Sequence, residues 1–148
     1  MNKLISFVKE LTKAEVKELN SSERIGRKYF YMSKELKELK DSIKLEPYSA
    51  GIFLGELKNN QFMPSIALLD ILANYSHRKI FINKKGQTMF LYGNDVFVEN
   101  IEENNVSDGI CLVLNEENEV LGYGELKTGR KTILKHILDR GDFLRRES

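Results

Sequence analysis

The chain has few of the features that mark a secreted, membrane-bound or disulfide-stabilised protein. Its 148 residues include one cysteine, Cys111, so no internal disulfide can form. No apolar run approaches the ~20 residues that a membrane helix needs. The start, Met1–Leu4, leads into charged residues instead of the apolar core of a signal peptide. We therefore expect a cytoplasmic protein.

The chain also lacks the common patterns of catalysis and cofactor binding. It has no glycine-rich phosphate loop, no dinucleotide fingerprint, and no serine, histidine and aspartate at catalytic spacing. His77 and His136 have no ligand-spaced companions, so we expect them at the surface or at a domain boundary, with no metal bound. Cys111 lies in the apolar run Gly109–Leu114 and is expected to pack in a buried strand. We predict a protein without enzymatic activity or cofactor.

What the chain does contain is typical of a globular protein: 41% hydrophobic and 30% charged residues. The pattern changes near Tyr75–Arg78. Helices and strands are expected before this point, and short strands separated by turns after it. The fold class predicted is α+β with two lobes. Residues 1–76 form an N-terminal α/β lobe with antiparallel strands and helices, and residues 77–148 form a small β-barrel or sandwich.

Apolar spacing and capping residues place the elements of the first lobe. A helix is predicted over Leu4–Leu11, followed by a helical turn through Leu19 that starts at a capping box of Thr12 and Glu15. Strands are predicted over 27–32 and 50–57, the second one leading into a turn at 58–60. Further helices are predicted from Ser33 to Pro47, carrying Leu36, Leu39 and Ile43, and from Pro64 through Leu72.

In the second lobe, turn residues separate short apolar runs. A strand is predicted over Lys79–Ile82, with turns at 84–86, 104–105, 115–118 and 127–129. Residues 87–92 fit either a strand or a short helix that leads to Gly93. Residues 132–138 have helix spacing, but a terminal barrel strand is equally compatible with them.

Charge is strongly segregated although the formal net charge is only +1. Residues 77–85 carry four basic groups and no acidic one, whereas residues 86–126 carry nine acidic groups and neither lysine nor arginine. Residues 127–148 return to seven basic groups against three acidic ones. Such asymmetry predicts that different faces of the second lobe meet different partners.

Three strings in the second lobe resemble the PUA domain, an RNA-binding module. They are Phe90–Val96, Leu121–Gly124 and Asp139–Arg146, in which glycines interrupt apolar runs and paired arginines end the chain. The whole chain further resembles the Nip-seven family of large-subunit ribosome biogenesis proteins. That resemblance also rests on Tyr29–Ser33, Gly51–Gly55, Gln61–Phe62 and Leu69–Ala73, and it ends at Glu147.

The family resemblance implies an α/β N-terminal lobe joined to a C-terminal PUA-like β-barrel that binds single-stranded or irregular RNA. Asn100–Ile101 stands where many PUA domains have a glycine before the isoleucine. The segment before Tyr29 is shorter than in eukaryotic members, so the chain resembles an archaeal-type member. The acidic stretch from Asp95 to Glu125 argues against RNA contact by that face.

The predicted RNA-binding residues come partly from the resemblance and partly from charge. The resemblance assigns Arg145 and Arg146 directly, and Arg140 less directly. Barrel closure is expected to bring the first strand, near Lys79–Lys85, beside the last, near 134–146, and so to merge two basic segments. Tyr92 and Tyr123 could stack on bases, although core packing is the favoured alternative for both. The complete predicted set is Arg145, Arg146, Arg140, Lys84, Lys85, Lys135 and Tyr92.

We therefore predict a non-catalytic RNA-binding protein of large-subunit ribosome biogenesis. Its expected partners are ribosomal RNA or its precursor and other assembly or RNA-processing proteins, with neither membrane nor DNA. One alternative is a protein-interaction adaptor whose acidic face recruits a basic protein, for example an enzyme that processes or modifies ribosomal RNA. A weaker alternative is an RNA-modifying enzyme with a catalytic first lobe, but residues 1–76 offer it no nucleophile, metal set or cofactor loop.

Overall fold

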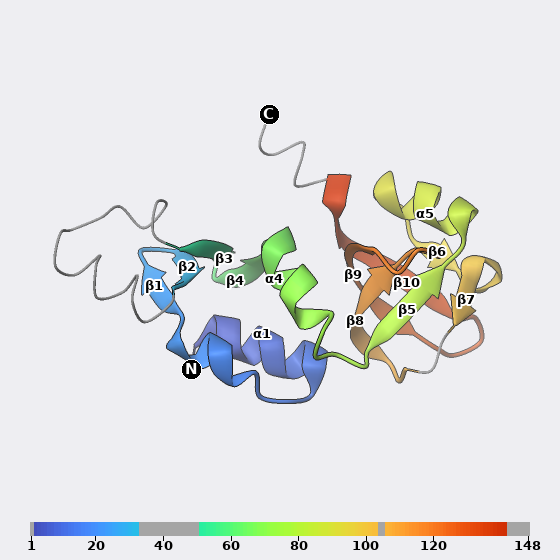
Figure 1. The fold of residues 1–148 in the computed structure, drawn as a ribbon. Coiled ribbons are helices and arrows are strands. Elements are labelled where there is room, and N and C mark those ends of the chain that lie inside the picture. The colour runs from blue at the N-terminus through green and yellow to red at the C-terminus, as the bar shows by residue number, and fades with distance from the viewer. Residues whose placement is uncertain (1, 33–50, 104–105, 142–148) are drawn as a thin grey trace, which may run out of the picture. The chain divides into compact units, whose positions relative to one another are not determined.

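The computed structural model describes residues 2–32, 51–103 and 106–141. It divides the chain into two compact units, Met1–Ile71 and Leu72–Ser148, each with its own sheet (Figure 1). The predicted α+β class with two lobes is confirmed. Within the described residues, no helix combines the length and the apolar character needed to span a membrane.

The first unit is a four-stranded antiparallel sheet with a helix packed on it. The strands are β1 (Glu23–Ile25), β2 (Lys28–Tyr31), β3 (Ile52–Lys58) and β4 (Gln61–Pro64), hydrogen-bonded in that order. Helix α1 (Lys3–Thr12) was predicted correctly, and it buries Leu4, Phe7, Val8 and Leu11. The ring of Phe7 lies 5.4 Å from that of Phe62 on β4, which lies 5.5 Å from the ring of Tyr29 on β2. Aromatic contacts therefore join α1 to this face of the sheet.

The segment that follows α1 differs from the sequence prediction. The capping box is wrong, because the Thr12 hydroxyl donates back to the Val8 carbonyl at 2.7 Å. A 3-10 helix, η1 (Lys17–Ser21), follows without a side-chain cap, although it does include Leu19. The helix predicted to begin at Ser33 lies outside the described residues.

Pro64 was expected to open a helix, but it ends β4. Because β4 is an edge strand, a residue without an N–H removes no ladder hydrogen bond there. Helix α4 (Ile66–Leu72) follows Ser65, whose hydroxyl accepts from the Leu68 N–H at 3.1 Å and donates to the Phe53 carbonyl at 2.7 Å. The serine thus satisfies the helix start and ties it to β3. Leu68, Leu69 and Leu72 are fully buried, as predicted for the core.

The second unit is a six-stranded, nearly closed barrel sheet. Its strands are β5 (Lys79–Ile82), β6 (Val96–Phe97), β7 (Ile101–Glu103), β8 (Gly109–Leu114), β9 (Val120–Lys127) and β10 (Ile133–Asp139). The order is β6-β10-β9-β8-β5-β7, and only the β5–β8 pair is parallel. The predicted barrel is confirmed, and residues 133–139 are a strand. Its core consists of Ile80, Ile82, Phe90, Val96, Cys111, Val113, Leu121, Leu126 and Leu134.

Glycines let strands β9 and β10 approach closely. A Cβ on Gly124 would overlap the carbonyl oxygen of Lys135, and one on Gly122 would overlap that of Leu138. The β9–β10 register shifts between His136 and Leu138, which indicates a bulge in β10. The glycines that interrupt this apolar run therefore permit the close backbone approach of the two strands.

Candidate nucleic-acid interface

Helix α5 (Lys84–Leu91) begins where the sequence predicted a turn at residues 84–86. That prediction is wrong because Asn83 caps a helix: its side-chain oxygen accepts from the Gly86 N–H at 2.8 Å. The Asn83 N–H is itself bonded to the Asn100 carbonyl at 3.0 Å. The helix also settles the open alternative for residues 87–92, which continue it to its C-cap at Tyr92.

Gly86 and Phe90 place α5 against the barrel, at the upper end of this unit in Figure 1. A Cβ on Gly86 would lie 3.1 Å from the Ile82 Cβ, so a larger residue would push the helix outward. Phe90 is fully buried, with its ring 4.9 Å from the ring of His136 on β10. The solvent-facing positions of the helix include Lys84, Lys85 and Thr88.

The turn that joins β8 to β9 faces α5 and is internally braced. The side-chain oxygen of Asn115, a residue only 3% exposed, accepts hydrogen bonds from the N–H groups of Glu117 at 3.0 Å and Glu119 at 2.9 Å. Asn118 has a positive φ of 65°, which asparagine tolerates well. The predicted turn at 115–118 is confirmed, and its carboxylates are exposed.

A continuous depression, here called the α5 groove, separates α5 from this turn. It consists of two hollows of about 530 Å³ and about 270 Å³ that share Gln87, Asn115 and Glu119. The larger hollow is also lined by Lys84, Thr88 and Glu117. The smaller one is also lined by Leu91, Val120, Leu121, Arg140 and Gly141. The groove therefore carries a cation in each hollow and polar or acidic side chains in the shared part.

Arg140 belongs to the groove because β10 ends directly before it. Its Nε–H donates to the Val120 carbonyl at 2.9 Å, which fixes the side chain beside the start of β9. Lys84 lies at the start of α5, so the groove brings together two predicted residues that are 56 positions apart in sequence. The other groove residues, chiefly Gln87, Asn115 and Glu119, were not predicted, since no sequence pattern joins a helix face to a distant turn. Asn115 and Glu119 belong to the acidic stretch that was expected to face away from RNA.

The remaining predicted residues do not all lie at this groove. Lys85 is exposed on α5 but does not line either hollow. Lys135 is exposed on β10, where it lies opposite Glu125. It is five residues before Arg140, which corresponds to roughly 16 Å between the two along an extended strand. Arg145 and Arg146 lie outside the described residues.

The two tyrosines considered for stacking have different environments. Tyr92 is 78% exposed at the C-cap of α5, where Gly93 follows with a φ of 86°. Tyr123 is 6% exposed within β9. Core packing, the favoured alternative for both, is therefore confirmed for Tyr123 and wrong for Tyr92. Tyr92 is four residues beyond Thr88 and continues the side of α5 that borders the groove.

The first and last long strands of the barrel, β5 and β10, are not neighbours, so the reason for expecting the two basic segments to meet is wrong. We expected β5 and β10 to adjoin on closure, but β8 and β9 lie between them, and the edge strands are β6 and β7. Helix α5 contacts both β5 and β10 instead. The basic groups near β5 thus approach the end of β10 through helix α5, whose first residues were predicted as a turn and whose remainder was left open between strand and helix.

Arg78 was counted within a basic segment, but it is a buried structural residue with 7% exposure. Its guanidinium donates to the carbonyls of Ile110 at 2.8 Å and Ser107 at 2.7 Å, and to the Ser107 hydroxyl at 3.0 Å. Carbonyl oxygens from the start of β8 therefore surround its charge. Arg78 contributes to the fold of this unit and not to an RNA-binding surface.

His136 has a structural setting that the sequence analysis missed. Its Nε2 lies 2.6 Å from the Oδ2 of Asp139, which is fully buried, and its backbone N–H donates to Asp95 at 2.8 Å. Only 13% of the His136 side chain is exposed, so the surface position predicted for it is wrong, whereas His77 is exposed. The bulge in β10 creates this contact, and periodicity alone does not reveal it.

Family models match both parts of the chain. Residues 1–66 match the model described as the NIP7/UPF0113 pre-PUA domain, and residues 78–148 match the UPF0113 PUA domain. A UPF0113 protein of Aeropyrum pernix is 32% identical over 124 residues, which cover 81% of this chain and 70% of that protein.

Two further relatives have similar identity. A UPF0113 protein of Archaeoglobus fulgidus is 28% identical over 114 residues, or 70% of this chain and 65% of that protein, slightly less than two thirds of its length. A 60S ribosome subunit biogenesis protein, nip7, of Schizosaccharomyces pombe is 28% identical over 134 residues, or 82% of this chain and 74% of that protein.

Proposed function

We propose that this chain, which belongs to the NIP7/UPF0113 family, binds single-stranded or irregular RNA through its second unit during assembly of the large ribosomal subunit. The PUA family model supports RNA binding, and the names of the ribosome biogenesis relatives support a role in assembly. The role proposed is non-catalytic and cytoplasmic, with ribosomal RNA or its precursor and other assembly proteins as partners.

The α5 groove is the observation that carries this proposal. Lys84 and Arg140 supply cations in its two hollows, and Arg140 is held by its bond to Val120. An arginine can bind phosphate through two parallel N–H groups, and a lysine binds it as a point charge. Each of these two cations can contact a phosphate of a strand that lies along the groove, and Glu117 adds a negative charge to the hollow of Lys84.

The shared middle of the groove suits bases better than phosphates. Glu119 carries negative charge there, whereas Gln87 and Asn115 offer both donors and acceptors. Carboxylate and amide groups pair with the amino groups and acceptor atoms on base edges. The exposed ring of Tyr92 provides a nearby stacking face, worth roughly 1–3 kcal/mol per base.

The other predicted residues belong to the proposal through the family resemblance and through their charge. Arg145 and Arg146 rest on the family resemblance. Lys85 and Lys135 are exposed cations that contribute to the field around the second unit. With about four phosphate contacts in total, the dependence of log affinity on log salt should have a slope near roughly −3 for single-stranded RNA.

A salt titration with charge-removing variants tests the groove. We expect Lys84→Gln and Arg140→Gln each to reduce the salt slope by about 0.7 and to weaken binding of all RNA sequences alike. The control is Lys127→Gln with Lys131→Gln, two exposed cations of the same unit that do not line the groove. Binding would be measured by fluorescence anisotropy of a labelled single-stranded RNA. An unchanged slope for Lys84→Gln, which leaves the Val120 bond intact, would contradict the groove as the RNA site.

Exposed carboxylates favour a second candidate function, that of a protein adaptor. Glu99, Glu102, Glu116 and Glu117 are all exposed, and Phe97 and Val98 add apolar side chains that are 43% and 54% exposed. Exposed carboxylates and apolar side chains of this kind suit a basic protein segment. A pull-down before and after nuclease treatment separates the two functions, because an adaptor keeps its partner when RNA is digested.

A further inference from the structure

The first unit has a cationic hollow at one end of its sheet. Two hairpin turns, Gly26–Arg27 between β1 and β2 and Asn59–Asn60 between β3 and β4, lie at that end. They share an end because β2 and β3 are antiparallel, with Lys28 opposite Glu56. The Leu57 N–H donates to the Arg27 carbonyl at 2.7 Å, so the first turn is tied directly to β3.

Both turns have fixed backbone conformations. Gly26 has a φ of 63°, a value that glycine adopts without strain. Asn59 and Asn60 have φ values of 51° and 62°, the pattern of a type I′ hairpin turn, in which asparagine is favoured. The side chains at this end of the sheet are therefore presented from a rigid frame.

The turns enclose a hollow of about 260 Å³, here called the turn-end hollow, lined by Arg24, Arg27, Leu57, Asn59 and Asn60. Among these described lining residues none is acidic. Lys58 follows the lining residue Leu57 in sequence and is exposed. Its ammonium lies 3.6 Å from the carboxylate of Glu56. The hollow therefore has an excess of positive charge in addition to its amide groups.

Arg24 is held in place before any ligand arrives. Its Nε–H donates to the Gly26 carbonyl at 2.8 Å, and its guanidinium carbon lies 5.8 Å from the centre of the Tyr29 ring. Tyr29 is 2% exposed and packs against Phe62, so the ring beneath the guanidinium is fixed. The bond to Gly26 uses one of the five N–H donors of an arginine. Ordering this side chain in advance lowers the entropy lost when an anion binds.

We propose that the turn-end hollow binds the sugar-phosphate backbone of RNA, as a contact in the first unit separate from the α5 groove. This inference rests on the proposed function, namely that the chain binds RNA. Arg24 and Arg27 bind phosphate oxygens, and Asn59 and Asn60 bond the ribose 2′-hydroxyl, which both donates and accepts. An acidic protein segment would also use the arginines, but its carboxylates only accept, so the amide oxygens would depend on backbone N–H groups of that segment. The donors and acceptors of the hollow therefore match RNA more completely.

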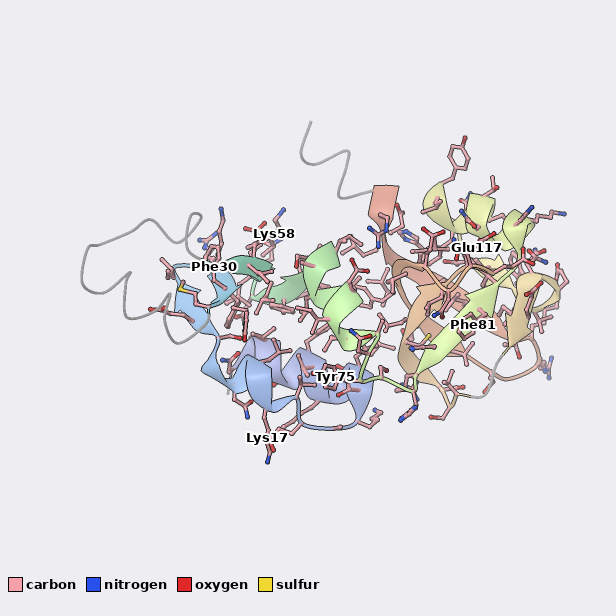
Figure 2. The ribbon with its side chains drawn as sticks, viewed as in Figure 1. Lys17, Phe30, Lys58, Tyr75, Phe81 and Glu117 are labelled. Carbon is pink, nitrogen blue, oxygen red and sulfur yellow. The ribbon has the colours of Figure 1, made fainter. Side chains whose placement is uncertain are left out.

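The test removes the two guanidinium charges and keeps most of the side-chain length. Arg24→Gln with Arg27→Gln in the full-length chain should reduce the salt slope for a labelled single-stranded RNA by about 1.4, and affinity at about 0.1 M salt by roughly 25-fold. The matched control, Lys9→Gln with Lys17→Gln, removes the same charge from exposed positions of the same unit. Figure 2 shows Lys17 on the opposite side of this unit from Lys58. The control should change the slope by much less than 1.4.

The outcomes separate this inference from the proposed function. If the native chain binds no RNA, the proposed function fails and this inference fails with it. If the native chain binds RNA and the Arg24 and Arg27 variant matches it in affinity and slope, only the turn-end hollow is refuted. It is also refuted if that variant binds RNA normally but loses binding to a poly-aspartate peptide, because the surface would then be a protein site. Loss of RNA binding that Arg24→Lys with Arg27→Lys restores in part supports the phosphate contact, since lysine keeps the charge without the planar fork.

Discussion

Cys111 is a thiol that the fold removes from water. It lies on β8 with no exposed surface, and its Sγ is 3.8 Å from the Gly124 carbonyl. Burial raises the pKa of this thiol to about 12, although the positive charge of Arg78 opposes the rise. Since the thiolate is the reactive form, the native side chain should be inert near neutral pH.

We expect iodoacetamide to leave Cys111 unmodified in the native chain at about pH 8 and to alkylate it in urea, where the thiol regains its ordinary pKa of about 9.0. Mass spectrometry of the intact chain gives the measurement. Glu116→Cys is the control, because it adds a thiol at an exposed position and should be alkylated once in the native state and twice in urea. Rapid native labelling of Cys111 would show that β8 opens far more readily than its burial implies.

The same shift has a consequence for stability at high pH. The pKa is higher in the folded state than in the unfolded state, so folding favours the protonated thiol. The resulting contribution to stability is present below the unfolded pKa of about 9.0 and is lost progressively as the pH rises toward about 12.

The pairing of strands β9 and β10 depends on two glycines, Gly122 and Gly124. Gly124 lies opposite His136, and an added Cβ would meet the Lys135 carbonyl oxygen and lie 3.1 Å from the Leu134 side chain. Backbone cannot move aside as easily as a flexible side chain can. The close pairing of these strands, and with it the bulge that brings His136 to Asp139, therefore requires glycine at this position.

We expect Gly124→Ala to lower the free energy of unfolding by about 1–3 kcal/mol through overpacking. Gly129→Ala is the matched control, because no atom lies within 4 Å of its added Cβ. That control should leave stability unchanged or raise it by about 0.4–1 kcal/mol, since alanine restricts the unfolded chain. Urea unfolding followed by circular dichroism measures both. Equal midpoints for the two variants would contradict the close approach of β9 and β10.

Sequence patterns predicted the elements whose signals are local. The apolar spacing of α1, the turn at 115–118 and the apolar run around Cys111 all led to correct assignments. Errors arose where one short motif suits two structures. Lys84–Gly86 resembles a turn until Asn83 is recognised as a cap, and Pro64 suits a helix start or an edge strand equally well.

The candidate sites depend on contacts over long sequence distances, which a single sequence does not specify. Charge segregation indicated that Lys84 and Arg140 belong to basic segments, and the structure shows that a helix and a distant turn place them on one groove. Nothing in the sequence distinguished Arg78, which is buried, from the exposed lysines close to it. In the first unit, the pairing of Arg24 and Arg27 with two asparagines requires knowledge of which turns share an end of the sheet.

Each of the two units has one proposed RNA contact, the turn-end hollow in the first and the α5 groove in the second. When two contacts are linked in one chain, the second binds at an effective concentration set by the link, provided that a single RNA reaches both. Affinity should therefore rise steeply once an RNA is long enough to occupy both surfaces. RNA below that length should bind to either surface alone, with a smaller salt slope because fewer phosphates are neutralised.

We expect a length series of single-stranded RNA to show this rise for the native chain and to lose it when either surface is altered. The two variants are Arg24→Gln with Arg27→Gln and, separately, Lys84→Gln. Each should reduce the gain in affinity for long RNA more than it reduces the affinity for short RNA, because each removes contacts that one long strand can make. Titration by fluorescence anisotropy gives the affinities, and analytical ultracentrifugation at saturation gives the stoichiometry. The idea that both surfaces act on the same strand would be contradicted by a gain in affinity that rises smoothly with length and survives both variants. It would also be contradicted if two short RNA molecules bound no more weakly than one long one.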